Sequence, residues 1–119
     1  MSNSSEFKKR DNRVIITCDN VSFPFDSITC GREISVYNRE AKGLLEKIQE
    51  SGYSDETVGN FMTFITQRIE NILGIGSVGA IFGKVCGYYD LLDLYNHIVN
   101  EYQAFTDFKI SQYSGKAAV

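Results

Sequence analysis

Hydrophobic and polar positions alternate near the start of the chain, as in strands that are covered on one side only. Two runs, 13–18 and 21–26, show this period of two. Asp19 and Asn20 separate them, and both residue types tolerate positive φ and bond their own backbone in turns. The pattern predicts a β-hairpin. Pro24 lacks an amide proton, so the second strand should lie at an edge or form its hydrogen bonds through its other face. The expected apolar face comprises Val14, Ile16, Cys18, Val21, Phe23 and Phe25.

Further along, hydrophobic residues recur at steps of three and four, which is the repeat of a helix with one buried face. After a connector at 27–31, we expect main helices over about 34–48, 54–73 and 90–108. Ser54 and Asp90 are residue types that cap helix starts, and Gly74 should end the second helix. A short turn of helix is expected around 78–82, within a segment that holds glycines at 74, 76, 79, 83 and 87.

These elements predict an α+β fold that is mostly α-helical, with an N-terminal β-hairpin packed on a bundle of three main helices plus one short helix. A chain of 119 residues with 43% hydrophobic content suits one core. The expected domain covers 13–108. Residues 1–12 should form a flexible arm, because they contain too few apolar residues to order themselves, and 109–119 should form a flexible tail.

Charge argues against two classes of partner. The chain carries 12 basic and 15 acidic side chains, a formal net charge of −3, which favours neither nucleic acid nor an anionic membrane surface. No apolar run approaches the roughly 18 residues of a membrane-spanning helix. The first residues are polar and do not resemble an export signal, so we expect a cytoplasmic protein.

Three cysteines, Cys18, Cys30 and Cys86, have spacings that match no zinc site or CxxC pair. Buried free thiols are the favoured interpretation. A disulfide between Cys18 and Cys30 fits the spacing, but a reducing compartment disfavours it.

Residues 74–79 have the GxGxxG spelling of a dinucleotide-binding loop. In such loops a strand enters the glycine turn and a helix leaves it, whereas here a helix is expected to enter. We interpret the segment as a connector, with cofactor binding as the minor alternative.

His97, the only histidine, and the Asp90–Asp93 pair are better explained by helix surface and helix capping than by catalysis. The sequence predicts no catalytic, cofactor or metal site and therefore no enzyme.

Three aromatic residues, Phe82, Tyr88 and Tyr89, flank the glycine connector rather than a helical stripe. Apolar side chains beside such backbone can form a docking patch for another protein. Core packing and partner contact explain these three residues equally well.

The stretch from Ile69 to Asp93 resembles tail assembly chaperones of long-tailed bacteriophages and related prophages. In that family a helix ends at a Gly-x-Gly-Ser/Thr stretch, a short Ile-Phe-Gly segment follows, and the last helix opens with Leu-Leu-Asp. Here Gly74, Gly76 and Ser77 match the first motif, 81–83 the second and 91–93 the third. The resemblance extends over roughly 13–105. It departs at Ile75, Val78 and Gly79, where the family carries an acid or charged residues.

The resemblance implies a non-enzymatic assembly factor, without a cofactor, in the host bacterial cytoplasm. It would bind the tape-measure protein, help to recruit tail-tube subunits, and is compatible with homo-oligomers. The residues expected to contact a partner are Ile75, Val78, Phe82, Tyr88 and Tyr89. The alternative is a structural tail or connector subunit that stays in the particle and pairs through its hairpin edge.

Overall fold

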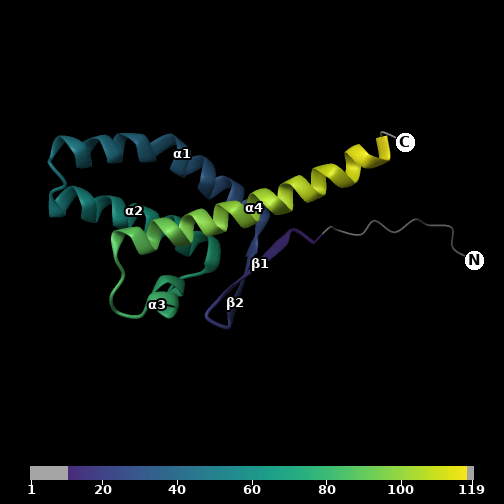
Figure 1. Cartoon of the computed structure of the whole chain (residues 1–119), viewed down its shortest axis with the longest axis horizontal. Coiled ribbons are helices and arrows are strands. Elements are labelled where there is room, and N and C mark those ends of the chain that lie inside the picture. The colour runs from purple at the N-terminus through teal and green to yellow at the C-terminus, as the bar shows by residue number, and fades with distance from the viewer. Residues whose placement is uncertain (1–10, 118–119) are drawn as a thin grey trace, which may run out of the picture.

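The computed structural model describes residues 11–117, which form a β-hairpin followed by four helices (Figure 1). The elements in chain order are β1 (Arg13–Cys18), β2 (Val21–Asp26), α1 (Ser27–Glu50), α2 (Asp55–Leu73), α3 (Ser77–Phe82) and α4 (Tyr88–Ala117). This confirms the expected α+β class, mostly helical with an N-terminal hairpin. Most of the expected N-terminal arm, residues 1–10, lies outside the described residues.

The hairpin follows the alternation in the sequence. β1 and β2 pair antiparallel with Val14 opposite Phe25, and both of these side chains are buried together with Ile16. Asp19 and Asn20 form the turn with φ of 47° and 68°. Positive φ at both turn residues matches the right-handed twist of the strands, which is why this two-residue sequence closes the hairpin.

The first helix begins earlier than the hydrophobic repeat suggests. Residues 27–31, expected to be a connector, form the first turn of α1. Asp26 caps this turn, because its Oδ1 accepts a hydrogen bond from the backbone N–H of Ile28 at 2.9 Å. Cys30 in the same turn is completely buried, so packing compensates for the weak helix preference of the segment.

The second helix starts where the sequence predicts. Ser54 is its N-cap and accepts a hydrogen bond at Oγ from the backbone N–H of Thr57 at 3.3 Å. The helix ends at Leu73, directly before Gly74. α2 is the centre of the packing, since it contacts α1, α3, α4 and β2. The largest fully buried side chains are Cys30, Phe61, Ile65, Ile69, Leu91 and Ile98.

The last helix differs from the expectation at both ends. It begins at Tyr88, so Asp90 is not the N-cap; the Asp90 carboxylate instead reaches back and accepts a hydrogen bond from the N–H of Gly87 at 2.8 Å. At the other end α4 continues to Ala117, so residues 109–117, expected to form a flexible tail, are helical. No proline or glycine occurs between 88 and 114 to end it.

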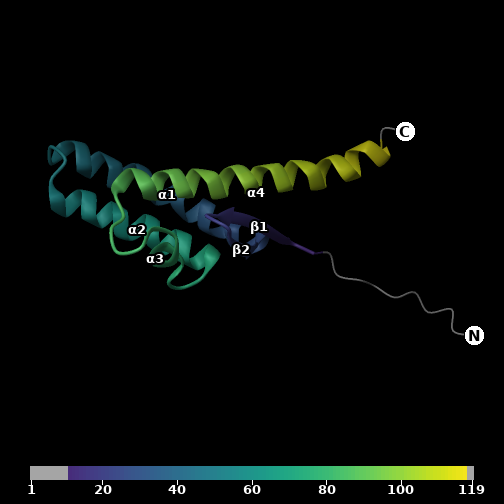
Figure 2. The same cartoon turned by 60° about the horizontal axis from the view of Figure 1, so that its bottom comes forward.

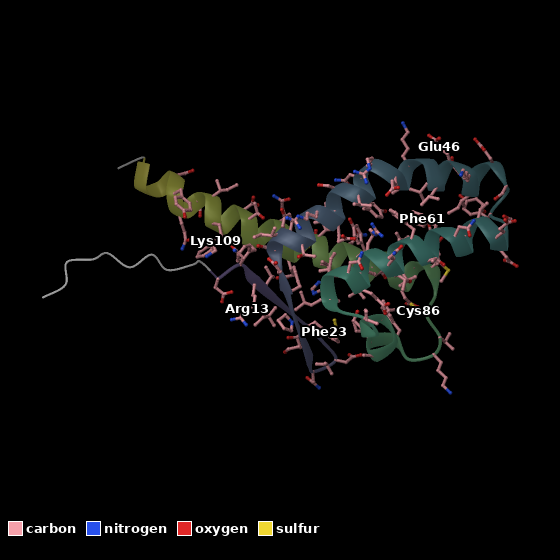
Figure 3. All side chains as sticks on the ribbon, turned by 180° about the vertical axis from the view of Figure 1, so that it is seen from behind. Arg13, Phe23, Glu46, Phe61, Cys86 and Lys109 are labelled. Atoms are coloured by element: carbon pink, nitrogen blue, oxygen red, sulfur yellow. The ribbon has the colours of Figure 1, made fainter. Side chains whose placement is uncertain are left out.

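The helices form a shallow bundle in which α1 and α2 run antiparallel and α4 passes beside them and beyond the hairpin (Figures 1 and 2). Side chains from the helices and the hairpin fill the space between them (Figure 3). An added Cβ at Gly31 on α1 would lie 2.8 Å from the hydroxyl oxygen of Tyr102 on α4, so the Tyr102 side chain would have to shift. Within residues 11–117, no helix is both long and apolar enough to cross a membrane.

Candidate functional site

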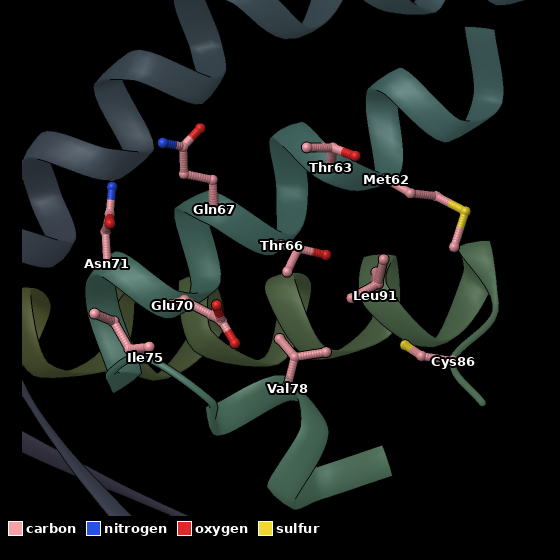
Figure 4. A pocket seen from close by; sticks show the side chains of 10 residues that line it. All are labelled: Met62, Thr63, Thr66, Gln67, Glu70, Asn71, Ile75, Val78, Cys86 and Leu91. Atoms are coloured by element: carbon pink, nitrogen blue, oxygen red, sulfur yellow. The ribbon is translucent and has the colours of Figure 1, made fainter. Parts of the chain in front are cut away.

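An open groove of about 600 Å³ lies between α2, α3 and the start of α4 (Figure 4). α2 supplies one wall, while the opposite side comes from α3 and the loops before and after it. The lining residues are Met62, Thr63, Thr66, Gln67, Glu70, Asn71, Ile75, Val78, Cys86 and Leu91. Val78 and Leu91 point into the space between the helices, so the groove has an apolar floor beneath a polar α2 rim.

The glycines of the α2–α3 loop determine the shape of the groove. Gly74 has φ 116° and ψ 153°, and Gly76 has φ 86°. The backbone N–H of Gly76 donates to Oε2 of Glu70 at 3.0 Å, which ties the loop to the last turn of α2. As a result the side chain of Ile75 is fully exposed at one end of the groove.

Replacement of Gly74 by alanine is expected to destabilise the protein by about 1–3 kcal/mol, because its backbone angles are almost restricted to glycine. Gly79, inside α3 with open space around its Cα, is the matched control. Gly79→Ala should leave stability unchanged or raise it by about 0.5–1 kcal/mol. Urea unfolding followed by circular dichroism measures both. Equal stability of the two variants would contradict the role given to Gly74.

The structure brings only two of the five expected partner-contact residues to this groove, Ile75 and Val78. Ile75 is accessible, whereas Val78 is only 8% exposed and packs in the core, so it offers little surface to a partner. Phe82 and Tyr88 are half-buried against the core. Tyr89 is exposed and lies edge-on to Tyr88, with ring centroids 5.2 Å apart.

The sequence reasoning missed the α2 wall of the groove. Met62, Thr66 and Glu70 recur at steps of four, so they form a stripe beside the buried one. Because two of these three side chains are polar, the stripe resembles an ordinary solvated helix face. The signal was present in the spacing, but only the position of α3 makes this stripe one wall of a groove.

The side chains considered for catalysis, His97, Asp90 and Asp93, do not line the groove. A helix, not a strand, leads into Gly74, unlike a dinucleotide-binding loop. His97 is exposed on α4 and does not line the groove. Asp90 is engaged by the Gly87 N–H, and Asp93 is exposed. Among the described residues there is no cluster of three or more His, Cys, Asp or Glu side chains that could hold a metal ion.

The three cysteines are free thiols, so the Cys18–Cys30 disulfide alternative is wrong. Only Cys30 is fully buried, while Cys18 and Cys86 are half-buried. Burial raises the pKa of the Cys86 thiol, and the Asp90 carboxylate raises it further. The Cys86 thiol is therefore protonated at neutral pH and is a soft apolar part of the groove rather than a nucleophile.

A network of polar side chains connects α1 to α2 on the side away from the groove floor. Oε1 of Glu33 lies 3.3 Å from Nη1 of Arg68 and accepts a hydrogen bond from Nδ2 of Asn71 at 3.0 Å. The charged side chains of the pair are only 11% and 15% exposed. The Arg68 guanidinium also lies over the ring of Phe64, 5.1 Å from its centroid. These contacts fix the orientation of α2, which carries the groove wall.

Buried thiol and tyrosine hydroxyl groups make the stability of the protein depend on pH. Burial raises the pKa of the Cys30 thiol from its ordinary 9.0 to about 12, and the nearby Glu33 adds to the effect. Burial likewise raises the pKa of the Tyr37 and Tyr95 hydroxyls above 10.0. The folded protein holds these protons more tightly than the unfolded chain does. Their contribution to stability is thus complete below about pH 9 and is lost as the pH rises toward 12.

We therefore expect the urea midpoint to be constant from about pH 7 to 8.5 and to fall steadily above about pH 9. The variant Cys30→Ala removes one of the titrating groups, so its midpoint should fall less steeply. A wild-type midpoint that stays constant up to about pH 11 would contradict the burial of these groups.

Comparisons with known proteins return no match: no protein-family model, no curated protein and no solved structure is similar to this chain.

Proposed function

We propose that this chain is a non-enzymatic tail assembly chaperone of a bacteriophage or prophage, which binds the tape-measure protein and helps to recruit tail-tube subunits. One observation carries the proposal. The stretch that resembles this family, from Ile69 to Asp93, is also the stretch that builds α3, its two glycine-rich loops and most of the open groove. A family signature that coincides with an accessible apolar groove favours protein binding.

Exposed apolar side chains around α3 support a binding role. Ile75 is 100% exposed, Val85 86% and Tyr89 75%, and all three belong to the loops around α3 or to the first turn of α4. Side chains of this size lose favourable burial energy when they face water. A partner with an apolar helix stripe would cover them, and the chaperone would in turn protect that stripe from aggregation.

The test is co-expression with the tape-measure protein encoded in the same genome. We expect the tagged chain to co-purify with the tape-measure protein and to keep it in the soluble fraction. Lysates without the chain provide the control. A tape-measure protein that remains equally soluble without the chain and does not co-purify with it would refute the proposal.

A structural subunit that stays in the particle is the second candidate, and the hairpin favours it. Within residues 11–117 the sheet has two strands, so each strand is paired on one side only. Pro24 removes an amide donor from β2, which leaves β1 as the edge better able to accept another strand. Mass spectrometry of purified particles separates the two candidates, because a chaperone should be absent from them and a subunit present in many copies.

A further inference from the structure

Carboxylates lie on the wall of the groove between α2 and α3 and next to it. Glu70 lies on its wall beside Ile75. Asp90 does not line the groove itself, but its carboxylate accepts a hydrogen bond from the N–H of Gly87 at 2.8 Å, directly after the lining residue Cys86. No lysine or arginine is among the lining residues. From 69 to 108 in the sequence, Lys84 is the only lysine or arginine, whereas the acidic residues are Glu70, Asp90, Asp93, Glu101 and Asp107.

The walls of the groove also restrict the conformation of an occupant. Every lining residue belongs to a helix or to one of the two loops around α3, and none belongs to a strand. An extended peptide would therefore find no strand edge to pair with its backbone N–H and C=O groups. A helix satisfies these groups internally, so it can enter an apolar groove without that penalty.

The dimensions fit a short helical segment. The α2 wall runs from Met62 to Asn71, which at about 1.5 Å per residue is roughly 14 Å, or between two and three helical turns. Met62 and Cys86 add soft side chains that adapt to different apolar shapes.

We propose that the groove binds an amphipathic helix of a partner protein whose apolar stripe of two to three turns is flanked by lysine or arginine. The apolar stripe contacts Met62 and Cys86 above the buried floor formed by Val78 and Leu91, and the flanking bases meet Glu70 and Asp90. Ile75 covers one end of the bound helix. This inference rests on the proposed function in that it names the segment of the tape-measure protein that the chain would select.

The experiment compares two synthetic peptides of about 18 residues, long enough to form a helix in water. Both carry the same leucine stripe; one has lysines at the flanks and the other has glutamates at the same positions. Fluorescence anisotropy with the full chain measures their affinities. We expect the lysine peptide to bind at least about 10-fold more tightly, and its advantage to shrink as salt is added.

Variants locate the binding site. Glu70→Gln and Asp90→Asn keep the acceptor oxygens that bond Gly76 and Gly87 but remove the charges. Each should weaken binding of the lysine peptide by about 2–5-fold. Ile75→Ser changes a fully exposed side chain, so the fold should be unaffected while affinity falls by about 10-fold or more. Glu46→Gln, on the exposed face of α1, is the control and should change nothing (Figure 3).

Several results would overturn the inference. These are equal affinity for both peptides, no binding of either, or equal effects of Glu70→Gln and Glu46→Gln. Self-association that Ile75→Ser abolishes would also overturn it, because a second copy would then occupy the groove. If the tape-measure protein still co-purifies with the Ile75→Ser variant at wild-type yield, the groove assignment fails while the proposed function stands. If the lysine peptide binds as expected but the tape-measure protein does not co-purify, the proposed function fails while the groove assignment stands.

Discussion

Replacing Phe61 with alanine is expected to destabilise the protein by about 3–5 kcal/mol, a large part of the total stability of a small domain. Phe61 is completely buried on α2. Its ring contacts Tyr37 from α1, Phe64 from its own helix and Tyr88 from α4, with centroid separations of 6.3, 6.1 and 5.9 Å. Because three helices meet at this ring, the cavity left by alanine cannot be closed by moving one side chain. Urea unfolding measured by circular dichroism gives the loss.

Phe108 on α4 is the matched control, because it is the same residue type but 59% exposed. Phe108→Ala should change the free energy of unfolding by no more than about 0.5 kcal/mol. A loss below about 1 kcal/mol for Phe61→Ala, or equal losses for the two variants, would show that Phe61 is not at the centre of the core.

Removal of Glu33 should have an effect of similar size. The variant Glu33→Ala leaves the Arg68 guanidinium almost buried and without its carboxylate, and breaking such a pair destabilises proteins by about 3–5 kcal/mol. The surface pair of Arg39 and Glu40 provides the control: its charges are 3.9 Å apart, and their side chains are 70% and 51% exposed. Glu40→Ala should change stability by less than about 1 kcal/mol.

A double replacement separates the charge effect from packing. Glu33→Leu with Arg68→Met fills similar space without charges, and it should recover most of the stability that Glu33→Ala loses. Nε of Arg68 is buried without a hydrogen-bond partner among the described residues, which makes the native pair incompletely satisfied and favours recovery. If the double variant is as unstable as Glu33→Ala, side-chain packing and not the buried charge explains the loss.

Local signals allowed the hairpin and the second helix to be predicted closely. The alternation around Asp19 and Asn20 led to both strands, because turn chemistry and period are properties of adjacent residues. Ser54 and Gly74 marked the ends of α2 for the same reason. Helix stops made by glycine and starts made by serine depend on a few backbone groups and little on the rest of the chain.

The lengths of α1 and α4 were predicted poorly, and the cause lies outside their own sequences. The first turn of α1 is stabilised by burial of Cys30, and α4 continues past the end of its apolar stripe at Phe105. Lys109 lies over the Phe105 ring, 5.3 Å from its centroid, and Gln103 donates to Asp107 at 3.1 Å. Contacts of this kind extend a helix without leaving a hydrophobic repeat.

By itself the sequence determined the fold class, the order of the elements and the glycine-rich break after α2, because period, capping and turn preference are local. Only the tertiary structure decided that α3 lies against α2, that Ile75 is exposed while Val78 is buried, and that Glu70, Ile75 and Cys86 line one groove. These facts depend on the packing of segments that are distant in the chain, and no pattern of neighbouring residues encodes such distances.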